Sequence, residues 1–362
     1  MTATDPPPDD RIVGEVCAAW LGAACATAPL PATGFSGAAL FAIDCPAGRF
    51  VLKSFAPGTA SRAAWVHGLM RHLARAGVET VPALLETPGG ETLVADRQGR
   101  VWELVEFIAG RPTAAPSAPQ AEAAAAALAR LHRAAATFPT QSAAAPAGLA
   151  RRIERAGSLL EDPWEAVLGR LPAAAPADGL AGRLREPLEA AISVFARAAG
   201  RRALERLAGL RPPPLAVQAV LRDVWAEHVL FAADQPQRVA GFVDFHAAGI
   251  DSPAADLARL LGSWHPPEVA AAGGLLAAWA GALDAYERER PLAAGERLAI
   301  PLFEATGVIF GLDNWFRWVF EERRSFPAVE PVLARVGWLL GRLPEALATL
   351  AKIPTPGQLG PV

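Results

Sequence analysis

Residues 219–264 read AVLRDVWAEHVLFAADQPQRVAGFVDFHAAGIDSPAADLARLLGSW and contain the most polar, least helix-like part of a largely helical second half. Asp223 and Asp244 each follow an apolar run, and His228 lies five residues after Asp223. A single aspartate in such a place is most often an ordinary turn residue. The pair with this spacing favours phosphoryl transfer, in which one carboxylate orients the acceptor and further ligands hold a divalent cation. The apolar runs predict short strands at 216–221, 228–232 and 239–245.

Two parts of this stretch resemble known motifs. LRDVWAEHVLF resembles the catalytic loop of the aminoglycoside phosphotransferase and choline kinase-like families, which have an asparagine at the position of His228. FVDFHAAGIDSPAADLARL resembles their metal-binding strand and the helix that follows it. The resemblance implies that Asp223 is the catalytic residue and that His228 and Asp244 bind a metal.

The catalytic loop departs from the family pattern. Leu221 and Arg222 replace the usual histidine and glycine, and His228 replaces the asparagine. Magnesium prefers oxygen ligands, whereas imidazole suits manganese or zinc better. His228 therefore either binds a softer metal or leaves Asp244 to hold magnesium together with water and phosphate.

The part of the chain before residue 110 is rich in predicted strands. GAALFAIDCPAGRFVLKSF predicts a β-hairpin with strands at 38–44 and 49–55 around a CPAG turn. ETLVADRQGRVWELVEFI predicts a second hairpin that turns at Arg97–Gly99. A helix is predicted at 59–77 between the two hairpins.

Lysine is rare in this chain, which has only Lys53 and Lys352 among its 34 basic residues. A bias toward arginine removes lysine wherever it is optional, so a retained lysine points to a role that a planar guanidinium fills poorly. Lys53 ends the second strand of the first hairpin, and the resemblance implies that it contacts the phosphates of a nucleotide. The alternative is a chance surface lysine.

Two further nucleotide contacts follow from the resemblance. Small residues in ATGFSGA, including Ser36 and Gly37, would let backbone amides approach the phosphates, although a Gly-x-x-Gly turn is weak evidence by itself. ELVEFIAGRP resembles the hinge of these kinases, where backbone groups of Glu106 and Ile108 would bind the adenine edge. The alternative for the hinge is an ordinary edge strand and turn.

The order of elements implies an α+β, bilobal, protein-kinase-like fold. We expect an N-terminal helical segment at 1–27, a small β-rich N-lobe at 28–110 that binds nucleotide, and a large, mostly helical C-lobe at 111–362. The C-lobe would hold the catalytic loop and the acceptor site. Its predicted helices are at 119–138, 147–161, 180–208, 268–290, 300–324 and 328–349.

Composition excludes several classes of protein. The 362 residues are 52% hydrophobic and 20% charged, which excludes a wholly disordered chain. A net charge of −3 gives no general attraction to nucleic acid or anionic membranes, so we expect neither as a partner. The N-terminal residues lack the pattern of an export signal. The three cysteines match no disulfide or metal framework, so we expect them to pack as small hydrophobic residues of a cytoplasmic protein.

The leading hypothesis is an ATP-dependent phosphotransferase that acts on a hydroxyl or amine of a small molecule, with magnesium or manganese. The alternative is a nucleotide-binding pseudokinase used as a regulatory module, because the helix at 59–77 contains no acidic residue to pair with Lys53. Only His67 and His72 could substitute there. A helical scaffold without nucleotide would not explain Lys53 together with both aspartates.

One aromatic cluster, in GLDNWFRWVFEERRSF, admits two interpretations. Trp315 and Trp318 could form part of a cage for a cationic acceptor. Their helical spacing favours a role in the core instead.

Overall fold

The computed structural model describes residues 10–22, 25–30, 38–139, 147–171, 179–212, 214–264, 273–326 and 328–353. The chain forms two compact units, each assembled from three segments. Unit 1 consists of Met1–Thr140, Gln218–Gly249 and Gly281–Pro291, and unit 2 of Gln141–Val217, Ile250–Ala280 and Leu292–Val362. The lobe boundaries expected at residues 27 and 110 stay a prediction.

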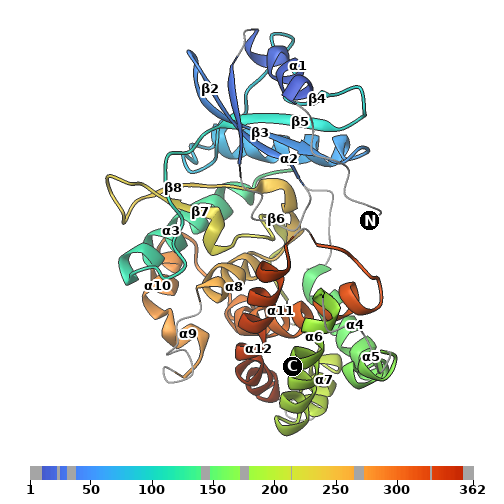
Figure 1. Ribbon diagram of the computed structural model, residues 1–362. Coiled ribbons are helices and arrows are strands. Elements are labelled where there is room, and N and C mark those ends of the chain that lie inside the picture. Colours follow the sequence, from blue (N-terminus) through green and yellow to red (C-terminus); the bar gives the residue numbers. More distant parts are fainter. Residues whose placement is uncertain are drawn as a thin grey trace. The chain divides into compact units, whose positions relative to one another are not determined.

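A five-stranded antiparallel sheet forms the first part of unit 1 (Figure 1). Both predicted hairpins are confirmed: β2 pairs with β3, and β4 pairs with β5 across a turn in which Gly99 has a φ of +77°. β1 begins inside the segment at 1–27 that the sequence predicted to be helical, and the sequence predicted no strand there. In spatial order β1-β2-β3-β5-β4, the strands are β1 (Ala26–Pro29), β2 (Leu40–Cys45), β3 (Gly48–Phe55), β5 (Val101–Glu106) and β4 (Val94–Ala95).

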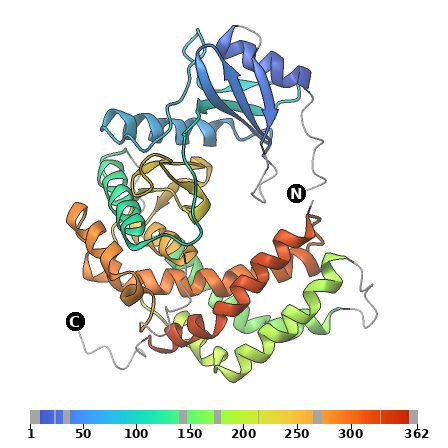
Figure 2. The same cartoon turned by 60° about the vertical axis from the view of Figure 1, so that its left-hand side comes forward.

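Alternation of side chains along the strands gives this sheet two different faces. Helix α1 (Asp10–Leu21) covers one face, and helix α2 (Ala60–Arg75) lies on the other (Figures 1 and 2). Lys53 and Glu103 belong to the face on the side of α2. The face under α1 forms an apolar core of Val13, Val16, Cys17, Trp20, Phe41, Ile43, Leu52, Trp102 and Leu104.

The rest of unit 1 includes most of the stretch that the sequence singled out. The three predicted strands are present, and β7 pairs with β8 in antiparallel register. A buried hydrogen bond of 2.8 Å between His132 Nδ1 and the Tyr286 hydroxyl joins α3 to α10. The elements are α3 (Ala118–Ala135), β6 (Gln218–Val220), η1 (Ala226–His228), β7 (Val229–Phe231), β8 (Val239–Phe242), η2 (Phe245–Ala247) and, except for its first residue, α10 (Ala280–Glu289). β9 (Gly249–Asp251) begins at the last residue of one unit 1 segment and continues into unit 2.

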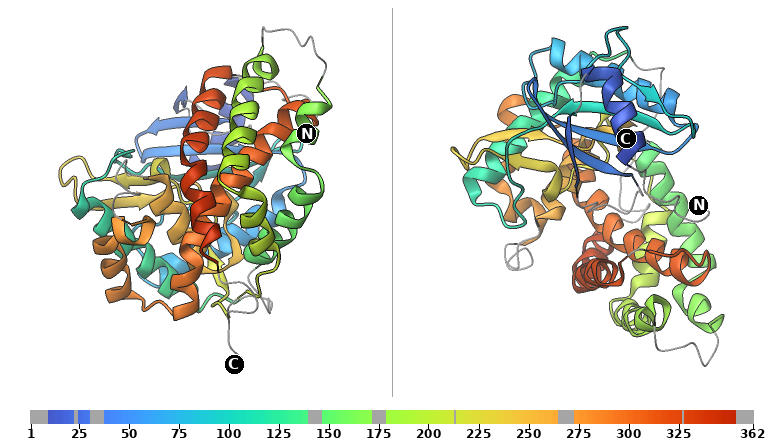
Figure 3. Two further views of the ribbon diagram at one scale, coloured as in Figure 1. Left: turned by 90° about the horizontal axis from the view of Figure 1, so that it is seen from below. Right: turned by 45° about the horizontal axis from the view of Figure 1, so that its top comes forward.

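Unit 2 is helical, and α6 and α12 run side by side in it (Figure 3). The single helix predicted at 180–208 is two helices, because Ala199 adopts a left-handed conformation with a φ of 51°. Among the described residues, no helix has the length and apolar character that crossing a membrane requires. The helices are α4 (Ala147–Glu161), α5 (Trp164–Gly169), α6 (Leu180–Arg197), α7 (Gly200–Ala208), α8 (Pro253–Ser263), α9 (Leu275–Ala278), α11 (Ala294–Phe320) and α12 (Val329–Ala351).

Candidate active site

A cavity of about 250 Å³ lies within unit 1 and gathers most of the residues that the sequence singled out. Its apolar lining comes from β2, β3, β5, α2 and the segment after β8. The polar part of the lining is supplied by Lys53, Glu103, Glu106, Glu227, His228, Asp244 and His246. An apolar cavity with a few convergent charged groups is the usual form of a small-molecule site.

Lys53 and Asp244 form an ion pair in this cavity, although 191 residues separate them in sequence. Lys53 Nζ donates to Asp244 Oδ1 at 2.6 Å. Burial acts to raise the pKa of Asp244, but the Lys53 ammonium and then His228 outweigh it and hold that pKa below its usual value. Asp244 is therefore an anion that a cation can approach.

The backbone around Asp244 is held in an unusual conformation. Asp244 has a φ of 62°, in the left-handed region that non-glycine residues rarely adopt outside functional or strained positions. The ring of His246, two residues after Asp244, stacks on the ring of Phe55 with centroids 4.4 Å apart. Arg62 of α2 donates to the carbonyl oxygens of His246 and Ala248. These contacts tie the segment after β8 to α2 and to the end of β3.

His228 is oriented as a metal ligand would be. Its Nδ1 lies 2.6 Å from the Asp223 carbonyl oxygen, which can only accept, so Nδ1 carries the proton. The lone pair is then on Nε2, which lies 3.9 Å from Asp244 Oδ2. A backbone carbonyl that fixes the imidazole in this way is a common support for metal-binding histidines.

These two side chains could both contact one divalent cation, because Nε2 of His228 and Oδ2 of Asp244 are close enough for an ion to lie between them. Within the described part of the chain, no third histidine, cysteine, aspartate or glutamate completes such a group. Phosphate oxygens and water are the ligands that magnesium and manganese accept in that situation.

Asp223 adjoins this cluster through its own backbone. Its carboxylate accepts from Trp225 Nε1 at 2.6 Å, and its carbonyl oxygen holds His228. Arg222, directly before it, has a φ of 65°. The turn after β6 is therefore fixed on both sides of Asp223.

The sequence reasoning missed Glu103. Its Oε2 accepts from His67 Nε2 at 2.7 Å, and His67 Nδ1 lies 2.7 Å from the Thr92 hydroxyl. His67, which could have replaced the missing acidic partner of Lys53, instead holds this carboxylate on β5. The signal was present in the hinge motif, because ELVEFIAGRP begins with Glu103 and alternation places Glu103 on the same side of β5 as Val105.

The remaining predicted nucleotide contacts divide into two groups. Glu106 and Ile108 line the cavity, as the hinge interpretation requires. Ser36 and Gly37 lie outside the described residues.

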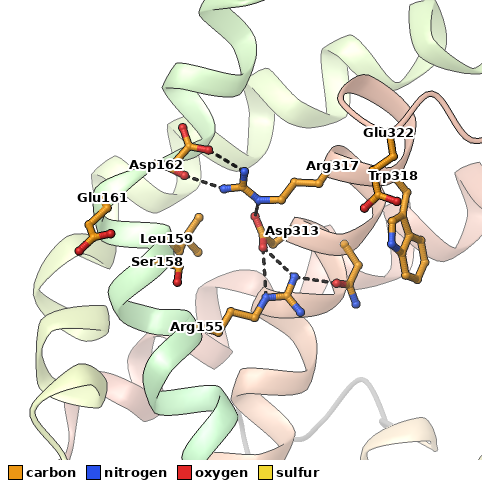
Figure 4. Close-up of a pocket in the computed structure, with 10 residues that line it drawn as sticks. Arg155, Ser158, Leu159, Glu161, Asp162, Asp313, Arg317, Trp318 and Glu322 are labelled. Carbon is orange, nitrogen blue, oxygen red and sulfur yellow. Dashed lines mark hydrogen bonds and ion pairs between the residues drawn. The ribbon is translucent and has the colours of Figure 1, made fainter.

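A second cavity, of about 500 Å³, lies within unit 2 between α4 and α11 (Figure 4). The carboxylate of Asp313 accepts from Arg155 Nη2 at 2.7 Å and from Arg317 Nε at 2.9 Å. Arg317 Nη1 also donates to Asp162 at 2.6 Å. The ion pair of Arg155 with Asp313 joins α4 to α11, and the four carboxylates of the lining outnumber its two arginines.

The two tryptophans of α11 differ in burial. Trp315 is 5% exposed and belongs to the core of unit 2, and its ring packs edge-on against Trp318 with centroids 5.2 Å apart. Trp318 is only partly buried and lines the 500 Å³ cavity. The guanidinium of Arg324 lies 4.7 Å from the Trp318 ring centroid, so the cation over this ring is the chain's own arginine.

Comparisons with known proteins extend over most of the chain. The family model described as "Phosphotransferase enzyme family" matches residues 27–292. Homoserine kinase of Nitrobacter winogradskyi is 30% identical over 240 residues, which make up 65% of this chain and 62% of that protein.

Two solved structures share the fold. Spectinomycin phosphotransferase, in complex with ADP and spectinomycin, has a TM-score of 0.68 at 10% identity and is matched over 96% of this chain and 99% of its own. A microcompartment-associated aminopropanol kinase has a TM-score of 0.58 at 15% identity, over 94% of this chain and 98% of its own. The predicted α+β kinase-like fold is confirmed. Because the family match runs from β1 through the Asp244 segment, this chain belongs to the phosphotransferase enzyme family.

Proposed function

We propose that this chain is an ATP-dependent kinase of small molecules. The observation that carries the proposal is the ion pair of Lys53 and Asp244 in a cavity that Glu106 and Ile108 also line. An ammonium for phosphates, a carboxylate for a cation and an apolar lining for a base are what a nucleoside triphosphate requires.

The nucleotide would contact three parts of unit 1. Lys53 holds its phosphates, and we propose that backbone amides of Ser36 and Gly37 contact them as well. Backbone groups of Glu106 and Ile108 bind the adenine edge. Much of the catalysis is then positioning, because phosphoryl transfer demands little covalent chemistry of the protein.

Asp244 and His228 would hold the divalent cation, magnesium or manganese. Such an ion, when bound, neutralises charge that develops on the phosphoryl group. Asp223 orients the acceptor hydroxyl and accepts its proton, and Trp225 and His228 fix the turn that presents it.

We propose that the acceptor is a small molecule with both a hydroxyl and an amine. Support comes from the names of the similar proteins, because homoserine and aminopropanol each carry these two groups. The hydroxyl would receive the phosphoryl group.

The test is ADP release with homoserine, aminopropanol and spectinomycin as acceptors, with magnesium and with manganese. Asp223→Asn should leave ATP binding near that of the wild type and reduce turnover by about a hundredfold or more, because its role is confined to the transition state. Asp244→Asn should reduce the metal-dependent part of ATP binding.

The outcomes separate the alternatives. ATP binding without ADP release on a broad acceptor panel would contradict the kinase and support a pseudokinase. A wild-type protein that does not bind ATP would contradict both.

A further inference from the structure

Lys53 faces a second carboxylate inside the cavity. The antiparallel register of β3 and β5 places Lys53 directly opposite Glu103, so the two side chains lie on the same face of the sheet. Residues opposed in this way have Cβ atoms about 4.5–5.5 Å apart. Both side chains line the cavity.

Glu103 is held firmly on that face. Its side chain is 13% exposed and that of His67, which binds its Oε2, is 2% exposed. Because the carboxylate has two oxygens, it can accept from His67 and from an ammonium at the same time. Thr92 fixes the other ring nitrogen of His67.

When a metal ion and a nucleotide bind, the Lys53 ammonium needs an anionic partner other than Asp244. In this structure its ammonium pairs with Asp244, and its side chain is only 12% exposed. A divalent cation on Asp244 would repel that ammonium, and an ammonium in an apolar cavity then needs other anions, which are the nucleotide phosphates and a second carboxylate. Glu103 is the carboxylate placed to receive it.

We propose that Glu103 holds Lys53 toward the nucleotide phosphates when Asp244 binds the cation, and that His67 fixes Glu103 for this task. This inference rests on the proposed function. Glu103 and His67 are positioning residues, because they act through Lys53. The acid that the helix at 59–77 lacks is thereby supplied by β5, and α2 contributes the histidine that orients it.

A double-mutant cycle tests this coupling. Affinity for a non-hydrolysable ATP analogue with magnesium is measured by calorimetry for the wild type, Lys53→Ala, Glu103→Gln and the double variant. Glu103→Gln should lose about tenfold in affinity, and the double variant should be no weaker than Lys53→Ala alone. Glu86→Gln is the matched control, because Glu86 also pairs with α2, through Arg71, but on the exposed surface.

Two variants of His67 provide a second test in case a variant of Lys53 or Glu103 fails to fold. His67→Gln keeps a donor for Glu103 and should retain affinity, whereas His67→Leu should lose it. Additive losses for Lys53 and Glu103, or an unchanged Glu103→Gln, would overturn the inference. If the wild type fails to bind the analogue, or Lys53→Ala binds it normally, the proposed function fails instead.

A second observation, independent of nucleotide binding, concerns two cysteines. Cys25 directly precedes β1 and Cys45 ends β2. The register pairs Ala26 with Asp44, so the next pair along the strands is Cys25 with Cys45. Neither cysteine is in a disulfide in this structure, and both side chains are partly exposed.

The backbone pattern shows which kind of pair this is. Leu30 N donates to the Leu40 carbonyl oxygen at 2.8 Å, which makes these two residues a hydrogen-bonded pair. Hydrogen-bonded and non-hydrogen-bonded pairs alternate along antiparallel strands, so Cys25 and Cys45 form a non-hydrogen-bonded pair. Cα atoms in such pairs lie about 4.5 Å apart, within the range of about 4.4–6.8 Å seen in disulfides.

The third cysteine differs from these two. Cys17 is buried under α1, and burial, followed by the influence of Cys25 and Cys45, raises its pKa to about 11. Burial and then a hydrogen bond with Cys45 also raise the pKa of Cys25. A low thiolate fraction slows oxidation, so exchange requires long equilibration.

We propose that Cys25 and Cys45 form a reversible disulfide by exchange with a low-molecular-weight disulfide. One protein thiolate attacks the small disulfide, releasing one small thiolate and leaving a mixed disulfide. The second protein thiolate then displaces the second small thiolate, so two protein thiols are oxidised and one small disulfide is reduced to two thiols.

Equilibration of the intact protein with oxidised glutathione, followed by thiol counting after denaturation, tests this site. The wild type and Cys17→Ala should each lose two thiols without forming an intermolecular disulfide, and dithiothreitol should restore both. Cys25→Ser and Cys45→Ser should form no intramolecular disulfide. Retention of all three thiols in the wild type, or a disulfide that persists in Cys25→Ser, would overturn the proposal.

Discussion

Lys53 is expected to matter for ligand binding far more than for folding. Lys53→Ala should weaken ATP affinity by about 10- to 100-fold, the effect of losing one or two hydrogen bonds to a charged group. Asp244 is 37% exposed and can be hydrated in the variant, so the fold should persist. Lys53→Arg should restore binding only in part, because a planar guanidinium does not reproduce a compact ammonium.

Calorimetric titration with ATP checks this, with Lys352→Ala as the control because it removes the chain's other lysine, which is exposed at the end of α12. Unchanged affinity in both Lys53 variants would exclude the sheet as the phosphate-binding element.

His228 is expected to determine which metal supports binding. Manganese should support ATP binding better than magnesium in the wild type, because imidazole nitrogen suits manganese better. His228→Asn supplies an oxygen ligand and should move the preference toward magnesium. ATP affinity is compared for both proteins with each metal. Indistinguishable metal preferences would mean that His228 is not a ligand.

At the scale of elements, a buried ion pair joins the two longest helices of unit 2. Arg342 of α12 donates to Glu304 of α11, and their side chains are 6% and 10% exposed. Arg342→Leu leaves the carboxylate buried without its partner and should cost about 3–5 kcal/mol of unfolding free energy. Replacing both residues by leucine should recover most of that loss.

The same pair predicts a dependence on pH. Burial raises the pKa of Glu304, and Arg342 opposes this rise. Without Arg342 the folded-state pKa rises further, so the variant is most stable below the unfolded pKa of glutamate and loses stability as pH rises through the folded value. Denaturant unfolding of Arg342→Leu should be measured at pH values from below the unfolded pKa of glutamate to above the folded-state pKa of Glu304. The free energy of unfolding should decrease as pH rises across this range. A parallel slope in the wild type would contradict it.

Local sequence patterns predicted most of the helices and strands, but they missed β1 and the division of the helix at 180–208. Alternating apolar residues around the CPAG turn and around Gly99 were sufficient for both hairpins. β1 was missed because it is four residues long and ends in Pro29. The division of helix 180–208 depends on one left-handed residue, Ala199, whose sequence gives no sign of it.

The residues of the candidate site were likewise predicted only in part. The resemblance assigned Lys53 to the phosphates and Asp244 to the metal, and the structure places their side chains 2.6 Å apart, although both roles stay predictions. The roles of Asp223 and His228 stay predictions. Glu103 could not be found from α2 alone, because its link to His67 joins residues that are 36 apart and depends on how β5 pairs with β3.

For the whole molecule, the division into two units predicts two unfolding transitions. Every residue that lines the 250 Å³ cavity belongs to unit 1. A ligand at a hundred times its Kd stabilises the part that it binds by about 2.7 kcal/mol. We therefore expect ATP with its metal to raise one calorimetric transition and leave the other in place.

Arg342→Leu should lower the second transition, because both partners of the ion pair belong to unit 2. A single transition that ATP raises as a whole would show that the units unfold together.

Lys53 and Asp244 are 191 positions apart in the chain, so the ribosome makes Asp244 some time after Lys53. At about 5–20 residues per second, a ribosome makes Asp244 roughly 10–40 s after Lys53. The core under α1 needs no residue beyond Leu104 and can close early, whereas the cavity face of the sheet must wait for the later segment. During that interval its apolar strands are open to aggregation. Slowing translation between these two points, with synonymous codons alone, should lower the yield of folded protein.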